Sequence, residues 1–119
     1  MLINLSNHPT DQWDAEQLFA AQAQFGEVDF IQHPNIPPNW NREQVETLAN
    51  EYVNKILVAN PKKDLRIHVV GEPVFCFCFI TRMRQEGIPC LTSTTERMVE
   101  VRDNKKIITF RFESFRYYF

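Results

Sequence analysis

Apolar and polar positions follow one another along the chain in blocks that predict short strands and amphipathic helices. The apolar run MLINLS, residues 1–6, is typical of a buried strand, and VDFIQ at 28–32 and LRIHVV at 65–70 are also predicted strands. The clearest helical periodicity lies at 42–58, where apolar side chains recur every three or four positions: Val45, Leu48, Ala49, Tyr52, Val53, Ile56 and Leu57. We expect this face to lie in the core or in a subunit interface.

Capping residues and glycines set the expected limits of the first helix. It is predicted over residues 12–25, with Thr10 or Asp11 as its cap and Gly26 as its end. Its shared face is expected to consist of Ala15, Leu18, Phe19 and Gln22.

The next two helices are predicted from the same kinds of signal. Asn41 is expected to cap the second helix, after a loop at 33–40 that holds three prolines, and ANPKKD at 59–64 is expected to end it. A third, largely buried helix is predicted over 73–86, because Pro73 suits a first turn and Gly87 suits a helix end.

The C-terminal third is predicted to be a strand followed by a hairpin. IPCLTS at 88–93 is the fourth strand, and residues 98–112 form two strands joined by a turn at Asp103 and Asn104. The polar run 92–97, which begins within the end of the fourth strand, is expected to be a loop, although its threonines also fit a strand end.

This alternation of strands and helices predicts an α/β fold with a single domain over residues 1–119. We expect a Rossmann-like domain with a mostly parallel central sheet, helices on both faces and a C-terminal β-hairpin. The first and third strands should be neighbours near its centre. Ligands bind at the carboxyl ends of such strands, which selects three loops: 6–9, 71–73 and 92–97.

Composition narrows the classes of partner. The net charge of −2 and the pI of about 5.9 argue against a broad basic face for long nucleic acid, but they allow a small anionic ligand. The sequence shows no signal peptide and no apolar run long enough to span a membrane, and its odd number of cysteines predicts a cytoplasmic protein. Cys76, Cys78 and Cys90 are expected to be reduced, buried thiols without zinc spacing.

The three loops carry side chains that suit a phosphate or a nucleotide. Ser6 and His8 follow the first strand, and Gly71 lets backbone N–H groups approach a ligand at the start of a helix. The run Ser93, Thr94 and Thr95 offers uncharged donors, and Arg97 offers a fork for phosphate. Glu72 would contact a ribose hydroxyl or a base amino group, or it would neutralise Arg97.

Each of these features also has a structural interpretation. Residues 6–8 can cap the first helix, and Glu96 and Arg97 can form a surface ion pair. His68 lies in a predicted strand and is expected to be a core or inter-strand group, whereas His33 is expected to be exposed in its loop.

Short motifs in these loops resemble the small stand-alone CRISPR-associated proteins of the CARF-like ring nuclease group. They are LSNHP after the first strand, VVGEPVF after the third, and TSTTERMVEV followed by KKIITFRFESFRYY at the end. The chain departs from the group's pattern at Asn7, which splits an SH pair, and at Glu96, where a second basic residue would stand. The departures at Asn7 and Glu96 are expected to weaken catalysis more than ligand binding.

The resemblance implies a homodimer that binds cyclic oligoadenylate, the second messenger of type III CRISPR defence, across its dyad. It implies metal-independent cleavage by ribose 2′-hydroxyl attack, without a cofactor. On this basis Arg97, His8 and Thr95 are the candidate catalytic residues. The candidate ligand-binding residues are Ser6, Asn7, Gly71, Glu72, Ser93 and Thr94. Two alternatives stay open, namely a module that binds the messenger without cutting it and a dimeric adaptor without a nucleotide ligand.

Overall fold

The computed structural model of the protein describes residues 1–61 and 64–119, so Lys62 and Lys63, in the predicted end of the second helix, lie outside the described residues. The elements follow in the order β1 (Leu2–Ser6), the 3-10 helix η1 (Thr10–Gln12), α1 (Ala15–Phe25), β2 (Val28–Gln32), α2 (Arg42–Ala59), β3 (Arg66–Val69), α3 (Pro73–Gln85), β4 (Cys90–Arg102) and β5 (Lys105–Tyr117). The predicted alternation of strands and helices is confirmed.

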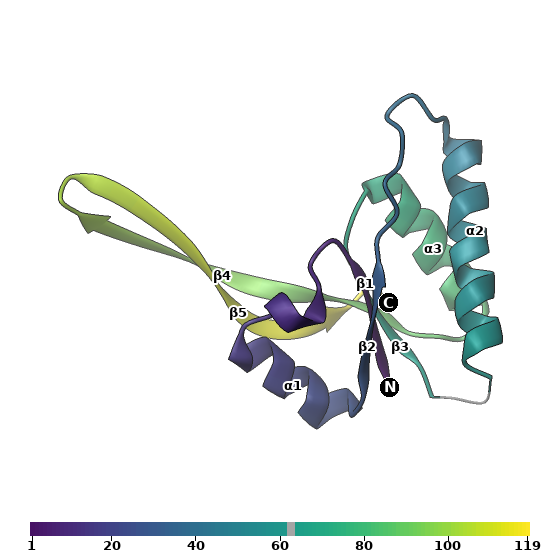
Figure 1. Ribbon diagram of the computed structural model, residues 1–119, viewed down its shortest axis with the longest axis horizontal. Coiled ribbons are helices and arrows are strands. Elements are labelled where there is room, and N and C mark those ends of the chain that lie inside the picture. Colours follow the sequence, from purple (N-terminus) through teal and green to yellow (C-terminus); the bar gives the residue numbers. More distant parts are fainter. Residues whose placement is uncertain (62–63) are drawn as a thin grey trace.

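The strands form one sheet in the order β2-β1-β3-β4-β5 (Figure 1). β1 is parallel to β2 and β3, and β3 is parallel to β4, whereas β5 is antiparallel to β4. The predicted Rossmann-like arrangement, with β1 and β3 adjacent, is therefore confirmed. The chain moves outward from β1 to one side of the sheet and from β3 to the other, so the topological switch point lies between these two strands.

Alternate residues of the central strands face two different layers. Ile3 of β1 and Ile67 of β3 belong to the larger core, which they share with α2 and α3. Leu2 and Leu91 belong to a smaller core on the opposite face, which they share with Trp13 and with Ala21 of α1. Helices thus cover both faces of the sheet, as predicted. The α1 face also buries three polar side chains near the carboxyl ends of the strands: Asn4, Ser6 and His68.

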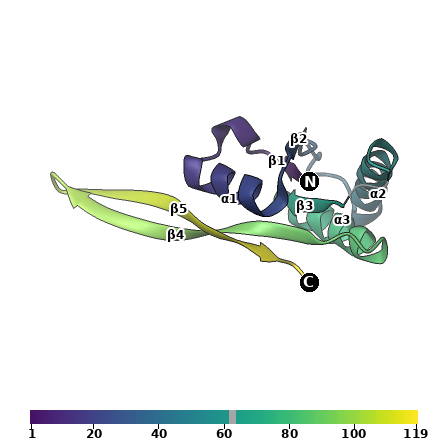
Figure 2. The same cartoon turned by 90° about the horizontal axis from the view of Figure 1, so that it is seen from below.

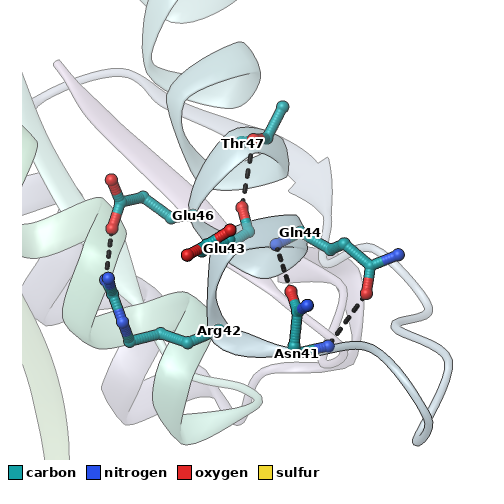
Figure 3. Close-up of polar contacts among 6 residues, drawn as sticks. All are labelled: Asn41, Arg42, Glu43, Gln44, Glu46 and Thr47. Atoms are coloured by element: carbon teal, nitrogen blue, oxygen red, sulfur yellow. Dashed lines mark hydrogen bonds and ion pairs between the residues drawn. The ribbon is translucent and has the colours of Figure 1, made fainter.

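Asn41 begins α2 as predicted and forms a reciprocal capping box (Figure 3). Its Oδ1 accepts a hydrogen bond from the Gln44 N–H at 3.0 Å, and Gln44 Oε1 accepts one from the Asn41 N–H at 2.9 Å. Two of the unpaired backbone donors at a helix start are satisfied in this way. The apolar face of α2 lies in the core of this chain, with four residues buried: Val45, Ala49, Val53 and Ile56.

The third helix begins at Pro73, and the Glu72 carboxylate accepts a hydrogen bond from the Phe75 N–H at 2.6 Å. Its buried side includes Cys76 and Cys78, and Cys90 is buried in β4, so the prediction of three free, buried thiols is confirmed. Burial raises the pKa of the Cys76 thiol to about 11 and that of Cys90 to about 12. At neutral pH these two thiols are therefore protonated, which makes them poor nucleophiles.

The predicted start of the first helix is wrong. Thr10 and Asp11 lie in η1, and α1 is capped by Asp14, whose carboxylate accepts a hydrogen bond from the Gln17 N–H at 2.8 Å. The reason is Trp13, which leaves the helical path to bury its indole against the sheet. The predicted shared face is also wrong, because Phe19 is 74% exposed and Ala21 is the buried residue.

The prediction of a loop at residues 92–97 is wrong as well. These residues lie inside β4, whose residues 91–102 pair with β5 in an antiparallel ladder that has a register shift between Thr94 and Thr95. β-branched threonines favour extended backbone, and the aromatic residues of β5 supply partners across the ladder. The predicted fourth and fifth strands are therefore one strand. The turn at Asp103 and Asn104 is confirmed, with φ of 50° and 61° as a type I′ turn requires.

The distal half of this hairpin projects away from the helices (Figures 1 and 2). The molecule is elongated as a result, with extents of 52 × 38 × 24 Å. Within residues 1–61 and 64–119, the helices are too short or too polar to cross a membrane.

Candidate functional site

A cavity of about 580 Å³ opens at the carboxyl ends of β1 and β3, on the α1 face of the sheet. This volume is within the usual range for small-ligand sites. The cavity brings together six residues predicted from the sequence to form a site: Ser6, Asn7, His8, Gly71, Ser93 and Thr95. The cavity also lies where the topology of a doubly wound sheet directs a ligand.

The loop after β1 is held in shape by the Ser6 side chain. Ser6 is 2% exposed, and its Oγ accepts a hydrogen bond from the His8 N–H at 3.1 Å and lies 2.8 Å from Asn4 Oδ1. Asn7 Oδ1 accepts a hydrogen bond from Gln32 Nε2 at 2.7 Å. Ser6 and Asn7 thus position the loop, and the exposed His8 side chain remains available at the cavity. The interpretation that residues 6–8 cap the first helix is wrong, because Asp14 does so.

Gly71 is required by the ring of His33. A Cβ atom at position 71 would lie 2.1 Å from His33 Cδ2, so any larger residue would displace the ring. His33 was expected to be exposed, but it is only 4% exposed. It is buried because its ring stacks edge-on against Phe75, 4.8 Å away, and its Nε2 accepts a hydrogen bond from the Glu72 N–H at 3.2 Å.

The strand that replaces the predicted third loop divides its side chains between two faces. Ser93 and Thr95 line the cavity beside Phe110 and Phe112 of β5. Thr94 instead bonds across the ladder, with its Oγ1 2.9 Å from Ser114 Oγ. Among the described residues, those that line the cavity include neither Thr94 nor Glu72 nor Arg97.

Arg97 lies two residues beyond Thr95, the last residue of β4 that lines the cavity. It is exposed and sits opposite Phe110 in the ladder, in the same alternating set of β4 positions as Ser93 and Thr95. Glu96 is opposite Arg111, which forms an ion pair with Glu16 of α1 at 3.0 Å. Residues 93, 95 and 97 therefore form a row that leads from the cavity onto the projecting hairpin.

A buried polar chain forms the floor of the cavity. His68 Nδ1 lies 3.1 Å from Asn4 Oδ1, and its Nε2 lies 3.3 Å from Ser93 Oγ. Burial, together with the nearby His8, lowers the pKa of His68 to about 4, so the ring is neutral at pH 7. The prediction that His68 is a satisfied inter-strand group is confirmed. It also touches the cavity, which the sequence interpretation missed.

Trp13 is a second lining residue that the sequence interpretation missed. Its ring lies edge-on to His68 at 5.2 Å, and its Nε1 is a buried polar atom without a hydrogen-bond partner among the described residues. Asn4 was missed too. A signal existed for Asn4 and His68, since each interrupts an apolar strand with a polar group at an inward-facing position.

The cavity has little formal charge. None of the described residues that line it is a lysine or an arginine, and its one acidic residue, Asp14, is engaged at the start of α1. No group of three or more His, Cys, Asp or Glu side chains in residues 1–61 and 64–119 is placed to hold a metal ion. The lining can offer hydrogen bonds from hydroxyl, amide and imidazole groups and aromatic surface for stacking.

Comparison with known protein families identifies one match over nearly the whole chain. A family model described as "Uncharacterized protein MJ1673 family" matches residues 1–116, and the chain belongs to this family. No curated protein was found to match the sequence.

Proposed function

We propose that this member of the MJ1673 family is a ring nuclease that binds cyclic oligoadenylate and opens its ring. The observation that carries the proposal is the cavity at the switch point of the sheet, where hydroxyl, imidazole and backbone groups from β1, β3 and β4 meet. Such groups suit ribose and base edges, and the exposed ring of Phe110 provides a face for stacking. The motifs that resemble the CARF-like ring nucleases lie in the segments that line this cavity.

The proposed reaction needs positioning more than it needs a strong catalyst. A ribose 2′-oxygen attacks the adjacent phosphorus, the bond from phosphorus to the 5′-oxygen breaks, and a 2′,3′-cyclic phosphate and a 5′-hydroxyl result. The 2′-proton leaves to a base and the 5′-oxygen gains a proton. His8 is exposed at the cavity and is the candidate for these transfers. Arg97 is the candidate for stabilising the phosphate charge, with Thr95 between it and the cavity floor.

The projecting hairpin supports a homodimer. Its distal half exposes apolar residues on both faces, and an isolated two-stranded ribbon is marginally stable in water. The exposed residues are Met98, Val99, Val101, Ile107, Ile108 and Phe110. Residues 95–112 hold five Lys or Arg and three Asp or Glu, whereas residues 1–41 hold five Asp or Glu and no Lys or Arg. Apart from Arg111 and Glu16, which already pair within one chain, these charges make the hairpin of one copy complementary to the N-terminal part of another.

A dimer would also supply what a single cavity lacks. A cyclic oligonucleotide has rotational symmetry, and a two-fold interface presents each loop twice. The hairpin cations of a second copy would add positive charge near a cavity that has none in its own lining. A cytoplasmic location follows from the proposed messenger and agrees with the three free thiols.

Binding without cleavage is the second candidate function, and a specific observation favours it. Arg97 lies outside the cavity lining, and Glu96 stands beside it in the strand. A cavity without a cation of its own can hold the ligand by hydrogen bonds and stacking, yet stabilise the transition state poorly. The protein would then lower the free concentration of the messenger without destroying it.

The test is incubation of the purified protein with cyclic tri-, tetra- and hexaadenylate in EDTA, followed by chromatography of the products and calorimetry of binding. Linear products that end in a 2′,3′-cyclic phosphate support the ring nuclease. Tight binding with an intact ring supports the second function. If none of the three rings binds, both functions are excluded and the adaptor hypothesis remains.

An arginine pair gives this test a matched control. Arg97→Ala is expected to slow ring opening about 100-fold, as loss of a transition-state donor does, with a smaller effect on affinity. Arg102→Ala changes the same residue type farther along β4, where Arg102 is exposed and pairs with Glu100 at 2.7 Å. Equal rates for the two variants would remove Arg97 from the reaction.

A further inference from the structure

We propose that Ser93 faces the cavity as a hydrogen-bond acceptor and that it selects its ligand through a donor group, the ribose 2′-hydroxyl. The polarity of Ser93 follows from the protein alone, whereas the identity of the donor rests on the proposed function. This assignment reverses the interpretation of the Ser93 hydroxyl as a donor to phosphate. It follows from a chain of hydrogen bonds that begins at a backbone carbonyl and ends at the cavity.

The chain begins at Asn4, whose amide can point in only one direction. Asn4 Nδ2 lies 2.9 Å from the His8 carbonyl oxygen and 3.1 Å from Thr10 Oγ1. A carbonyl oxygen can only accept, so the nitrogen of the amide must face His8. The Asn4 Oδ1 atom therefore faces the other way, toward Ser6 Oγ at 2.8 Å and His68 Nδ1 at 3.1 Å.

The orientation of Asn4 sets the tautomer of His68. Because Asn4 Oδ1 can only accept, His68 Nδ1 must carry the hydrogen. The ring is neutral because burial lowers its pKa, so Nε2 carries a lone pair and no hydrogen. Trp13 at 5.2 Å and Phe115 at 6.0 Å pack edge-on around the ring and hold its orientation.

The tautomer of His68 in turn sets the hydroxyl of Ser93. His68 Nε2 must accept a hydrogen bond, and Ser93 Oγ lies 3.3 Å away with one hydrogen to give. Once that hydrogen is used, the oxygen of Ser93 presents only lone pairs to the cavity that it lines. A phosphate oxygen has no hydrogen to donate and would leave these lone pairs unpaired, whereas a hydroxyl group satisfies them.

Cyclic oligoadenylate carries two kinds of donor, the ribose 2′-hydroxyl and the adenine amino group. The 2′-hydroxyl is the better match, because Ser93 lies in the same row of β4 positions as Thr95 and Arg97, the candidates for contact with the neighbouring phosphate. An acceptor at Ser93 would hold the hydroxyl that attacks that phosphate. Ser93 is thus a specificity-determining residue of the proposed reaction.

The ligand test uses 2′-substituted analogues of whichever cyclic oligoadenylate binds. The 2′-hydroxyl and 2′-amino rings carry a donor, whereas the 2′-deoxy ring carries none and the 2′-fluoro ring offers only a weak acceptor. We expect the deoxy and fluoro rings to bind about 3- to 10-fold more weakly than the other two, as loss of one neutral hydrogen bond predicts. Ser93→Ala should bind all four equally, whereas Ser114→Ala, which removes a hydroxyl outside the cavity lining, should keep the wild-type order.

If the wild-type protein binds the 2′-fluoro ring as tightly as the 2′-hydroxyl ring, the proposal is overturned. A fluorine can only accept a hydrogen bond, so Ser93 would have to be the donor. Equal binding of all four rings by the wild-type protein would also overturn the ribose assignment. Ser93 would then accept its hydrogen bond from the adenine amino group, or it would not contact the ligand.

A second measurement separates this inference from the proposed function. ¹⁵N NMR of the free protein, assigned with a His68→Ala variant, should show His68 as the neutral Nδ1–H tautomer at pH 7. His33, whose Nδ1 faces the Pro34 carbonyl at 2.8 Å, should show the same tautomer and serves as an internal reference. An Nε2–H tautomer at His68 would overturn the acceptor assignment even if the ring binds. If no ring binds but the Nδ1–H tautomer is found, the proposed function and the ribose assignment fail while the polarity of Ser93 stands.

Discussion

Buried imidazoles connect the loops of this protein to its sheet. His33 accepts the Glu72 N–H and faces the Pro34 carbonyl, and so joins the loop after β2 to the start of α3. His68 joins β1 to β4 through Asn4 and Ser93. Burial lowers the pKa of both rings, which means that the folded protein holds them as neutral groups. Protonation of His33 and His68 at acidic pH must therefore destabilise the folded state.

We expect the free energy of unfolding to fall as the pH drops from 6.5 to 4. An unfolded histidine binds a proton near pH 6.5, but folded His68 does so only near pH 4. The contribution of His68 to the free energy of unfolding is therefore complete above pH 6.5 and is lost as the pH falls from 6.5 to 4. The loss from His68 alone is about 3 kcal/mol, and His33 acts in the same direction. Denaturant titrations at several pH values will measure the change.

His68→Gln is the control for this pH dependence, because glutamine does not titrate. The difference in unfolding free energy between the wild-type protein and His68→Gln should shrink by about 3 kcal/mol between pH 7 and pH 4. A difference that stays constant over this range would contradict the assignment of His68 as a neutral buried group.

At the scale of elements, the helix starts differ in how far local chemistry determines them. Asn41 and Gln44 satisfy each other's backbone within four residues, so the start of α2 was predictable from the sequence. The start of α1 was not, because Trp13 is drawn out of the helix by the smaller core. The polar run at 92–97 is likewise a strand only because β5 pairs with it.

Asn41→Ala is expected to lower the free energy of unfolding by about 1 kcal/mol, because the Gln44 N–H at the start of α2 loses its hydrogen-bond acceptor. Glu51→Ala, at an exposed position inside the same helix, should change the stability by less than about 0.5 kcal/mol. Urea unfolding of both variants measures the difference. An equal effect of the two substitutions would show that the capping box adds no stability.

At the scale of the whole molecule, the projecting hairpin is the feature that the rest of the chain leaves uncovered (Figure 2). It exposes apolar side chains and carries an excess of cationic side chains, while the charged side chains of the N-terminal 41 residues are all carboxylates. A second copy of the chain would cover the exposed apolar side chains of the hairpin, and its carboxylates would neutralise the hairpin cations. The proposed dimer therefore depends on residues in the distal half of the hairpin.

Val101→Glu is expected to weaken the dimer at least about tenfold, because a charge would be placed in the contact of the hairpin. Val58→Glu is the matched control, since Val58 is 80% exposed on α2 and Val101 is 71% exposed on β4. Sedimentation velocity over a range of concentrations measures both variants. A monomeric wild-type protein, or equal weakening by the two variants, would contradict the role of the hairpin.

The sequence by itself determined the alternation of strands and helices, the cap of α2, the turn at residues 103 and 104, and the loops after β1 and β3. These follow from periodicity and local hydrogen bonding, which act within a few residues. Only the tertiary structure decided the length of β4, the burial of His33, and the chain from Asn4 through His68 to Ser93. The contacts of His33 and His68 join residues 25 to 64 positions apart, and the length of β4 depends on its pairing with β5 beyond the turn. A local pattern does not contain the positions of these partners.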